Sequence, residues 1–101
     1  MKHIAFKKVD LVNPKTLEKG KFDYREMLKA LVHNPLDGKS LDIDEVRSSI
    51  RLLDALEKGN EEGADLEDAD FAFLVKKIQS IKFTWADPVF INFVDDVTGA
   101  K

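Results

Sequence analysis

A chain of 101 residues, of which 44% are hydrophobic and 35% charged, suits one soluble domain and is too short for two independent cores. The charge is uneven, since residues 1–39 carry nine basic and five acidic side chains and residues 40–101 carry seven and fourteen. The absence of cysteine excludes disulfides and thiolate metal ligands. No segment has the roughly 20 apolar residues of a membrane span or the apolar core of a signal peptide, so we expect a cytoplasmic protein.

The first 22 residues have the pattern of an extended segment. Ile4, Phe6 and Val9 are separated by Lys7 and Lys8, and the turn-forming pair Asn13-Pro14 and Gly20 follow. This pattern predicts one or two short strands around a turn, either a β-hairpin or an extended arm. Because a two-stranded ribbon is not stable alone, we expect it to lean on the helices that follow.

A first helix is predicted over residues 24–33. Asp23 can cap its N-terminus, with Glu26 three residues later in a capping-box arrangement. Asn34-Pro35 ends it, because the residue before proline disfavours helical torsions. The predicted apolar stripe consists of Met27, Leu28, Leu31 and Val32.

The second helix is predicted over residues 42–58, with Asp42 or Ser40 as its cap and Gly59 at its end. Its apolar residues recur at three- and four-residue steps, opposite a charged face. A helix of this kind packs on one side only. The predicted stripe is Ile43, Val46, Ile50, Leu53 and Leu56.

A polar loop over residues 60–64 and a third helix over 66–81 are expected next. Asp65 is the predicted cap, and the acids in the first turn complement the helix macrodipole. Phe73 falls off the apolar stripe and needs a second surface to cover it. The predicted stripe is Phe71, Leu74, Val75, Ile78 and Ile81.

The last helix is predicted over residues 88–97, because Asp87-Pro88 matches an N-cap followed by proline at the first helical position. Its apolar residues cover more than one face, so it is either central to the core or partly committed to a partner. The predicted fold is therefore a mainly α, α+β domain of about four helices. We expect an extended or β arm at 1–22, a helical core at 23–97 and a frayed tail at 98–101.

No combination of side chains predicts catalysis or a metal site. His3 and His33 lack metal-ligand spacing, and Ser48-Ser49 have no adjacent base. Gly38-Lys39-Ser40 spells the end of a phosphate-binding loop but lacks its first glycine. The acids lack the glycine and spacing of a calcium loop. We expect no enzymatic activity, no cofactor and no metal.

The acids between Asp54 and Asp70 form the densest run of charge in the chain. Two interpretations stay open: a solvated loop and helix start, or recognition of a basic surface on another protein or a second copy. The basic N-terminal part suggests nucleic acid, but the overall pI near 5.3 and the scarcity of arginine there argue against it.

Four of the nine aromatic residues lie within residues 83–93. They either anchor the last helix to the core or form part of an exposed hot spot. Together with the acids, two aromatic residues complete a set of predicted partner-binding residues. The set is Glu57, Glu61, Glu62, Asp65, Glu67, Asp68, Phe73 and Trp85.

Three segments follow one another after the basic start: LDIDEVRSSIRLLDALEKG, DLEDADFAFLVKKIQSIKF and WADPVFINFVDDV. This order of an amphipathic helix, an acidic capped helix and a short closing helix resembles the layout of small accessory proteins of tailed bacteriophages and prophages. The resemblance covers most of the chain after Asp23 and assigns no functional residue. It implies a non-enzymatic role in the host cytoplasm, either assisting virion assembly or binding a host protein.

The sequence thus predicts a protein–protein interaction module that binds and modulates a host or phage protein. The alternative is a self-assembling morphogenesis protein, such as a head or tail assembly chaperone or structural protein, in which the basic part of one copy meets the acidic part of the next. A nucleic-acid-binding regulator is the third possibility. We expect no membrane partner.

Overall fold

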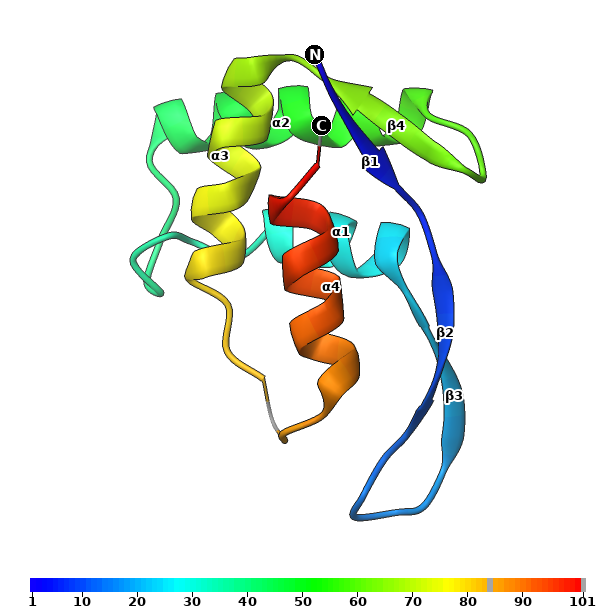
Figure 1. Cartoon of the computed structure of the whole chain (residues 1–101). Coiled ribbons are helices and arrows are strands. Elements are labelled where there is room, and N and C mark those ends of the chain that lie inside the picture. Colours follow the sequence, from blue (N-terminus) through cyan, green and yellow to red (C-terminus); the bar gives the residue numbers. More distant parts are fainter. Residues whose placement is uncertain (84, 101) are drawn as a thin grey trace.

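A computed structural model describes residues 1–83 and 85–100 of the chain. This part folds as a small α+β domain of four helices and two two-stranded antiparallel sheets (Figure 1). It confirms the predicted α+β domain of about four helices. Of the two alternatives for the N-terminal segment, the hairpin is the one present, and the second sheet was not predicted. The elements are β1 (Lys2–Ala5), β2 (Lys8–Val12), β3 (Lys19–Asp23), α1 (Tyr24–Val32), α2 (Ile43–Lys58), β4 (Gly63–Leu66), α3 (Asp68–Gln79) and α4 (Pro88–Thr98).

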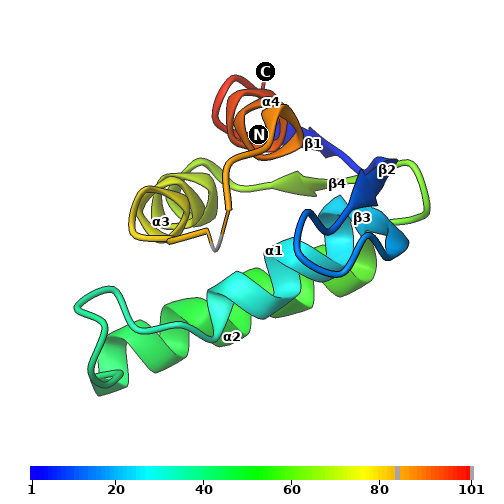
Figure 2. The ribbon, with the colours of Figure 1, turned by 90° about the horizontal axis from the view of Figure 1, so that it is seen from below.

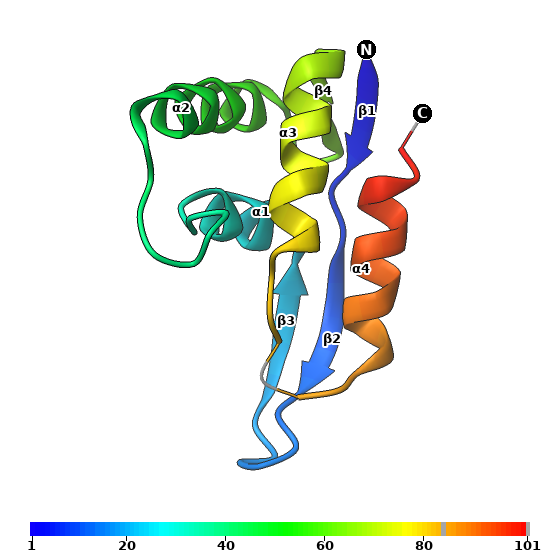
Figure 3. The ribbon, with the colours of Figure 1, turned by 90° about the vertical axis from the view of Figure 1, so that its left-hand side faces the viewer.

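The predicted hairpin is formed by β2 and β3, which pair from Lys8 opposite Asp23 to Val12 opposite Lys19. The Asn13 side chain starts the turn by accepting hydrogen bonds from the backbone amides of the residues two and three positions later, at 2.9 and 3.4 Å. Asparagine commonly makes this local bond, which explains why the chain reverses here. β1 continues into β2 as one long extended segment, with α4 beside it (Figure 3).

A second sheet pairs β1 with β4, with Ile4 opposite Ala64. The predicted polar loop at 60–64 and the predicted helix start at 66 are therefore wrong. The four residues of β4 are too few to show alternation, and the strand exists because β1 pairs with it from 60 residues away. A Cβ atom at Gly63 would lie 2.3 Å from the Ile4 carbonyl oxygen, so only glycine permits this approach.

Three of the predicted helix caps are confirmed. Asp23 accepts from the amides of the first turn of α1, Asp42 accepts from the Glu45 amide at 2.8 Å, and Asp87 accepts from the Val89 amide at 2.9 Å, with Pro88 at the first position of α4. Asp65 is not a cap. α3 begins later than predicted, after Glu67, whose side chain makes no capping bond.

The buried core joins all parts of the chain. Phe22 of the hairpin contacts Phe93 of α4 edge to face, with 5.2 Å between ring centroids, and Ile4 of β1 is also buried. Part of the predicted frayed tail is ordered, because Thr98 belongs to α4 and the Ala100 amide donates to the Val97 carbonyl. Lys101 lies outside the described residues. The core residues are Ile4, Phe22, Tyr24, Leu28, Leu31, Val32, Leu52, Leu56, Leu66, Leu74, Ile78, Phe90, Phe93 and Val97.

α2 forms one edge of the molecule, with α1, α3 and β4 all on its inner side (Figure 2). Its buried residues are Ser49, Leu52 and Leu56, whereas Ile43 is 62% exposed and Ile50 is 53% exposed. The predicted stripe is therefore wrong at these two isoleucines. The helix is turned so that Glu45, in line with the buried residues, faces a buried lysine of α3.

In the described part of the chain, no helix has both the length and the apolar character needed to cross a membrane.

Candidate functional site

The acidic run winds around one end of the molecule, from the last turns of α2 through the 59–62 connection and β4 into the first turn of α3. Of the predicted partner-binding residues, Glu57 lies on α2, Glu61 and Glu62 in the connection, and Asp65 on β4. Glu67 and Asp68 lie at the start of α3. The structure places Glu61 in a hollow with Phe6 and Arg25, and Glu67 in another hollow with Asp65.

Two of these acids contact the first residues of the chain. The β1–β4 register sets His3 opposite Asp65, and the His3 Nδ1 atom lies 2.8 Å from the Asp65 carboxylate. The Met1 amino group lies 3.4 Å from the Asp68 carboxylate. These two contacts join the start of the chain to β4 and to the first turn of α3.

Glu57 is also committed within the chain. Its carboxylate pairs with Lys29 and lies 3.7 Å from the Arg25 guanidinium. The bond from Lys29 lowers the pKa of Glu57, and the same bond raises the pKa of Lys29. This cluster joins α1 to the end of α2, and we interpret it as structural.

Glu61, Glu62 and Glu67 remain exposed and make no ion pair within the described residues. Their backbone is nevertheless fixed. The Asn60 side chain accepts from the amides of Glu62 and Gly63 at 2.8 and 3.1 Å, and the Glu62 carbonyl accepts from the Phe6 amide at 2.9 Å. These three glutamates, which we call the acidic surface, are held by a preformed backbone.

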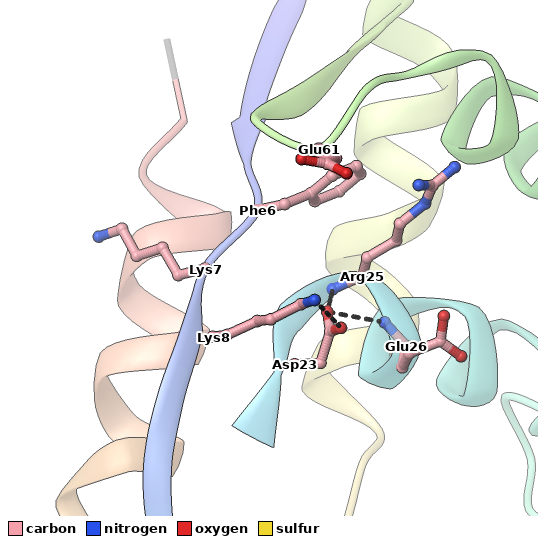
Figure 4. Close-up of a pocket in the computed structure, with 7 residues that line it drawn as sticks. All are labelled: Phe6, Lys7, Lys8, Asp23, Arg25, Glu26 and Glu61. Carbon is pink, nitrogen blue, oxygen red and sulfur yellow. Dashed lines mark hydrogen bonds and ion pairs between the residues drawn. The ribbon is translucent and has the colours of Figure 1, made fainter. Parts of the chain in front are cut away.

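A hollow of about 520 Å³ lies beside the acidic surface (Figure 4). Phe6 and Lys8 point from one side of the strand toward Asp23 and Arg25, and Glu61 lies above the Phe6 ring. The Lys8 ammonium is 3.9 Å from the Asp23 carboxylate, and the Arg25 guanidinium lies 5.5 Å from the centre of the Phe6 ring. Small-molecule pockets are mostly apolar, whereas this lining is mostly charged and fits a polar protein surface better.

Phe73 and Trp85 are both half-buried against the core. The Lys77 ammonium, four residues later in the same helix, lies 5.4 Å from the centre of the Phe73 ring. The Trp85 ring lies 5.5 Å from that of Phe90 and lines a hollow of about 170 Å³ against the β2–β3 hairpin. The role of Phe73 and Trp85 in binding stays a prediction.

The buried ion pair between Lys77 and Glu45 was not predicted from the sequence. The Lys77 side chain has no exposed surface, and its ammonium lies 2.6 Å from the Glu45 carboxylate, which is 10% exposed. Lys77 also donates to the Asn34 carbonyl, and the Leu36 amide donates to Glu45 at 2.9 Å. The pair holds the connection between α1 and α2 against α3. Its one signal in the sequence is a lysine next to Ile78 in an apolar stripe.

A second polar cluster joins α4 to the N-terminal part. The Tyr24 hydroxyl donates to Asp96 at 2.7 Å, and Lys7 donates to the same carboxylate at 3.0 Å. Burial, followed by the bond to Asp96, raises the pKa of Tyr24 to about 12, and the bond from Tyr24 lowers the pKa of Asp96. The tyrosine stays protonated at neutral pH, so this cluster acts as a link between elements.

Tyr24 is the only tyrosine in the chain, so its ionisation can be followed by ultraviolet absorbance. We expect its titration in the folded protein to lie near pH 12, above the ordinary value of 10.0. Because the folded-state pKa is raised, the stability from this group is complete below the unfolded-state pKa and is lost as pH rises through the folded-state pKa. Asp96→Asn should move the titration toward the ordinary value. A midpoint near 10.0 in wild-type protein that is still folded by circular dichroism would contradict the hydrogen bond.

Within residues 1–83 and 85–100, no group of three or more histidine, aspartate and glutamate side chains gathers as a metal site would require. The chemistry visible at the acidic surface is that of charge presented on a fixed backbone.

No protein-family model, no curated protein and no solved structure matches this chain.

Proposed function

We propose that this chain is a non-enzymatic protein-interaction module that binds a basic surface of another protein through its acidic surface. One observation carries the proposal. Asp65 and Asp68 are paired with the N-terminal strand and Glu57 with α1, whereas Glu61, Glu62 and Glu67 are exposed without an ion pair among the described residues. A preformed backbone that presents unpaired charge is suited to recognition.

The physical role of such a surface is to guide association and to set specificity. Exposed charges raise the rate of encounter with an oppositely charged partner and disfavour partners of like charge. Their reach is about 8 Å at physiological ionic strength, so binding weakens as salt is added. The resemblance in layout to phage accessory proteins makes a bacterial host protein or a phage protein the partner to seek first.

Reversal of Glu61 and Glu62 to lysine tests this proposal. We expect wild-type protein to capture a partner from bacterial lysate at low salt and to lose much of it at high salt. The double reversal should weaken that capture by roughly tenfold, because attraction to the basic partner becomes repulsion. The fold should be unchanged, since both side chains are exposed.

A matched control separates this surface from net charge. Glu18→Lys/Asp95→Lys also changes the formal net charge from −3 to +1, and both residues are exposed, make no ion pair among the described residues and lie outside the acidic run. We expect it to bind like wild type. If both double variants lost the same amount of partner capture, net charge alone would explain the effect. If neither lost capture, the acidic surface would have no part in binding.

Self-assembly is the second candidate function. It is favoured by a separate observation, the exposure of Ile43 and Ile50 on the outer side of α2.

A further inference from the structure

The outer side of α2 carries apolar side chains that the chain itself leaves uncovered. Ile43 and Ile50 are exposed, and they lie seven residues apart, two helical turns along the same face. α1, α3 and β4 all lie on the opposite side of the helix (Figure 2). Apolar side chains at such spacing on one helix face can serve as anchors for another helix.

Two opposite charges flank Ile50 on this face. Arg47 precedes it by three residues and Asp54 follows it by four, so both side chains lie next to it on the helix surface. Both are exposed, and neither makes an ion pair among the described residues. Their neighbour Arg51 differs, since it lies 3.9 Å from Asp70 of α3. The outer face therefore carries a positive charge on one side of Ile50 and a negative charge on the other, three and four residues away along the helix.

We propose that a second copy of this chain docks on this face, with the two α2 helices antiparallel about a two-fold axis near Ile50. In this arrangement Arg47 of each copy faces Asp54 of the other. The reason is that the axis passes between Ile50 and Arg51, midway between Arg47 and Asp54 along the helix. The two Ile50 side chains meet at the centre. A two-fold contact requires such a self-complementary patch.

The charges on this face favour a second copy as the partner and antiparallel packing of the two helices. A parallel arrangement would place Arg47 beside Arg47 and Asp54 beside Asp54, and like charges in contact oppose association. A second copy supplies both complementary charges at the required spacing. The helix has 16 residues, about 24 Å in length, so the contact is smaller than the roughly 800 Å² per partner of a stable interface. The dimer should be weak and should depend on concentration.

Sedimentation equilibrium of the full chain at low salt, over a range of concentrations, tests the proposal. Wild type should show a reversible monomer–dimer equilibrium. Ile50→Glu should weaken dimerisation by at least roughly tenfold, since two carboxylates would meet at the centre. A wild-type protein that stays monomeric up to the highest soluble concentration would overturn the proposal.

A charge swap tests the antiparallel register. Arg47→Asp and Asp54→Arg should each weaken the dimer by roughly tenfold, because each places two pairs of like charges in contact. The double variant restores opposite charges and should return to within about threefold of wild type. A double variant as weak as the single ones would overturn the register. Circular dichroism and unfolding midpoints like those of wild type ensure that the comparison is between folded proteins.

The α2 face can be tested apart from Glu61 and Glu62, although Asp54 and Glu67 line the same hollow. Glu61→Lys/Glu62→Lys should dimerise like wild type, and Ile50→Glu should capture the basic partner like wild type. Loss of dimerisation in the glutamate reversal would instead place the dimer contact at the acidic surface and contradict the α2 interface.

Discussion

Lys77→Met should lower the free energy of unfolding by about 3–5 kcal/mol, the range found when one partner of a buried ion pair is removed. The Lys77 side chain has no exposed surface and the Glu45 carboxylate is 10% exposed, so the change leaves a nearly buried negative charge without its counter-ion. The Asn34 carbonyl loses its donor as well. Urea unfolding followed by circular dichroism measures the effect.

A second variant separates the charge from the packing. Lys77→Met/Glu45→Gln removes both charges, and the glutamine oxygen can still accept the bond from the Leu36 amide. We expect it to recover most of the loss, because the unpaired charge, rather than the absent lysine, is the main cost. A loss below about 1 kcal/mol in the single variant would show that Lys77 reaches water and that the pair does not hold the α1–α2 connection.

Leu52→Ala should cost about 2–5 kcal/mol, as for other large-to-small changes in a packed core. Leu52 has no exposed surface, whereas the neighbouring Leu53 is only half-buried. Leu53→Ala is the matched control and should cost clearly less, because part of its side chain already contacts water. An equal or larger loss of stability for Leu53→Ala would show that α2 buries the face predicted from the sequence, which includes Leu53.

That expectation illustrates where sequence reasoning ends. Periodicity correctly placed α2 but could not orient it, because apolar residues fill two overlapping faces. The inner face includes the polar residues Ser49 and Glu45, which lie outside the predicted apolar stripe. Glu45 is tolerated there because Lys77 of α3 lies opposite it. A side chain on another helix therefore decides which of the two faces is buried.

Features that depend on neighbouring residues were predicted correctly more often than features that depend on residues far away in the sequence. The caps Asp23, Asp42 and Asp87 act on amides two or three residues away, so they can be predicted from the adjacent residues. Strand β4 cannot, because its hydrogen bonds come from β1 at the other end of the sequence. Its absence from the prediction also explains why Asp65 was expected to cap a helix.

The acidic run could be found from composition, but its division into paired and unpaired acids could not. That division depends on the β1–β4 register, which sets His3 opposite Asp65, and on the packing of α1 against the end of α2, which brings Lys29 to Glu57. Only the three-dimensional arrangement shows that Glu61 and Glu62 keep free charge. The surface proposed to bind is accordingly smaller than the predicted set.

The affinity of the captured partner at low and high salt, for wild type and for Glu61→Lys/Glu62→Lys, tests the proposed function most directly. The account predicts that wild type binds more tightly at low salt and loses affinity as salt increases. The double reversal should bind roughly tenfold more weakly at low salt and should not lose affinity as salt increases, because salt screens repulsion as it screens attraction. Equal affinity and equal salt dependence in the two proteins, or no partner bound by wild type at low salt, would contradict it.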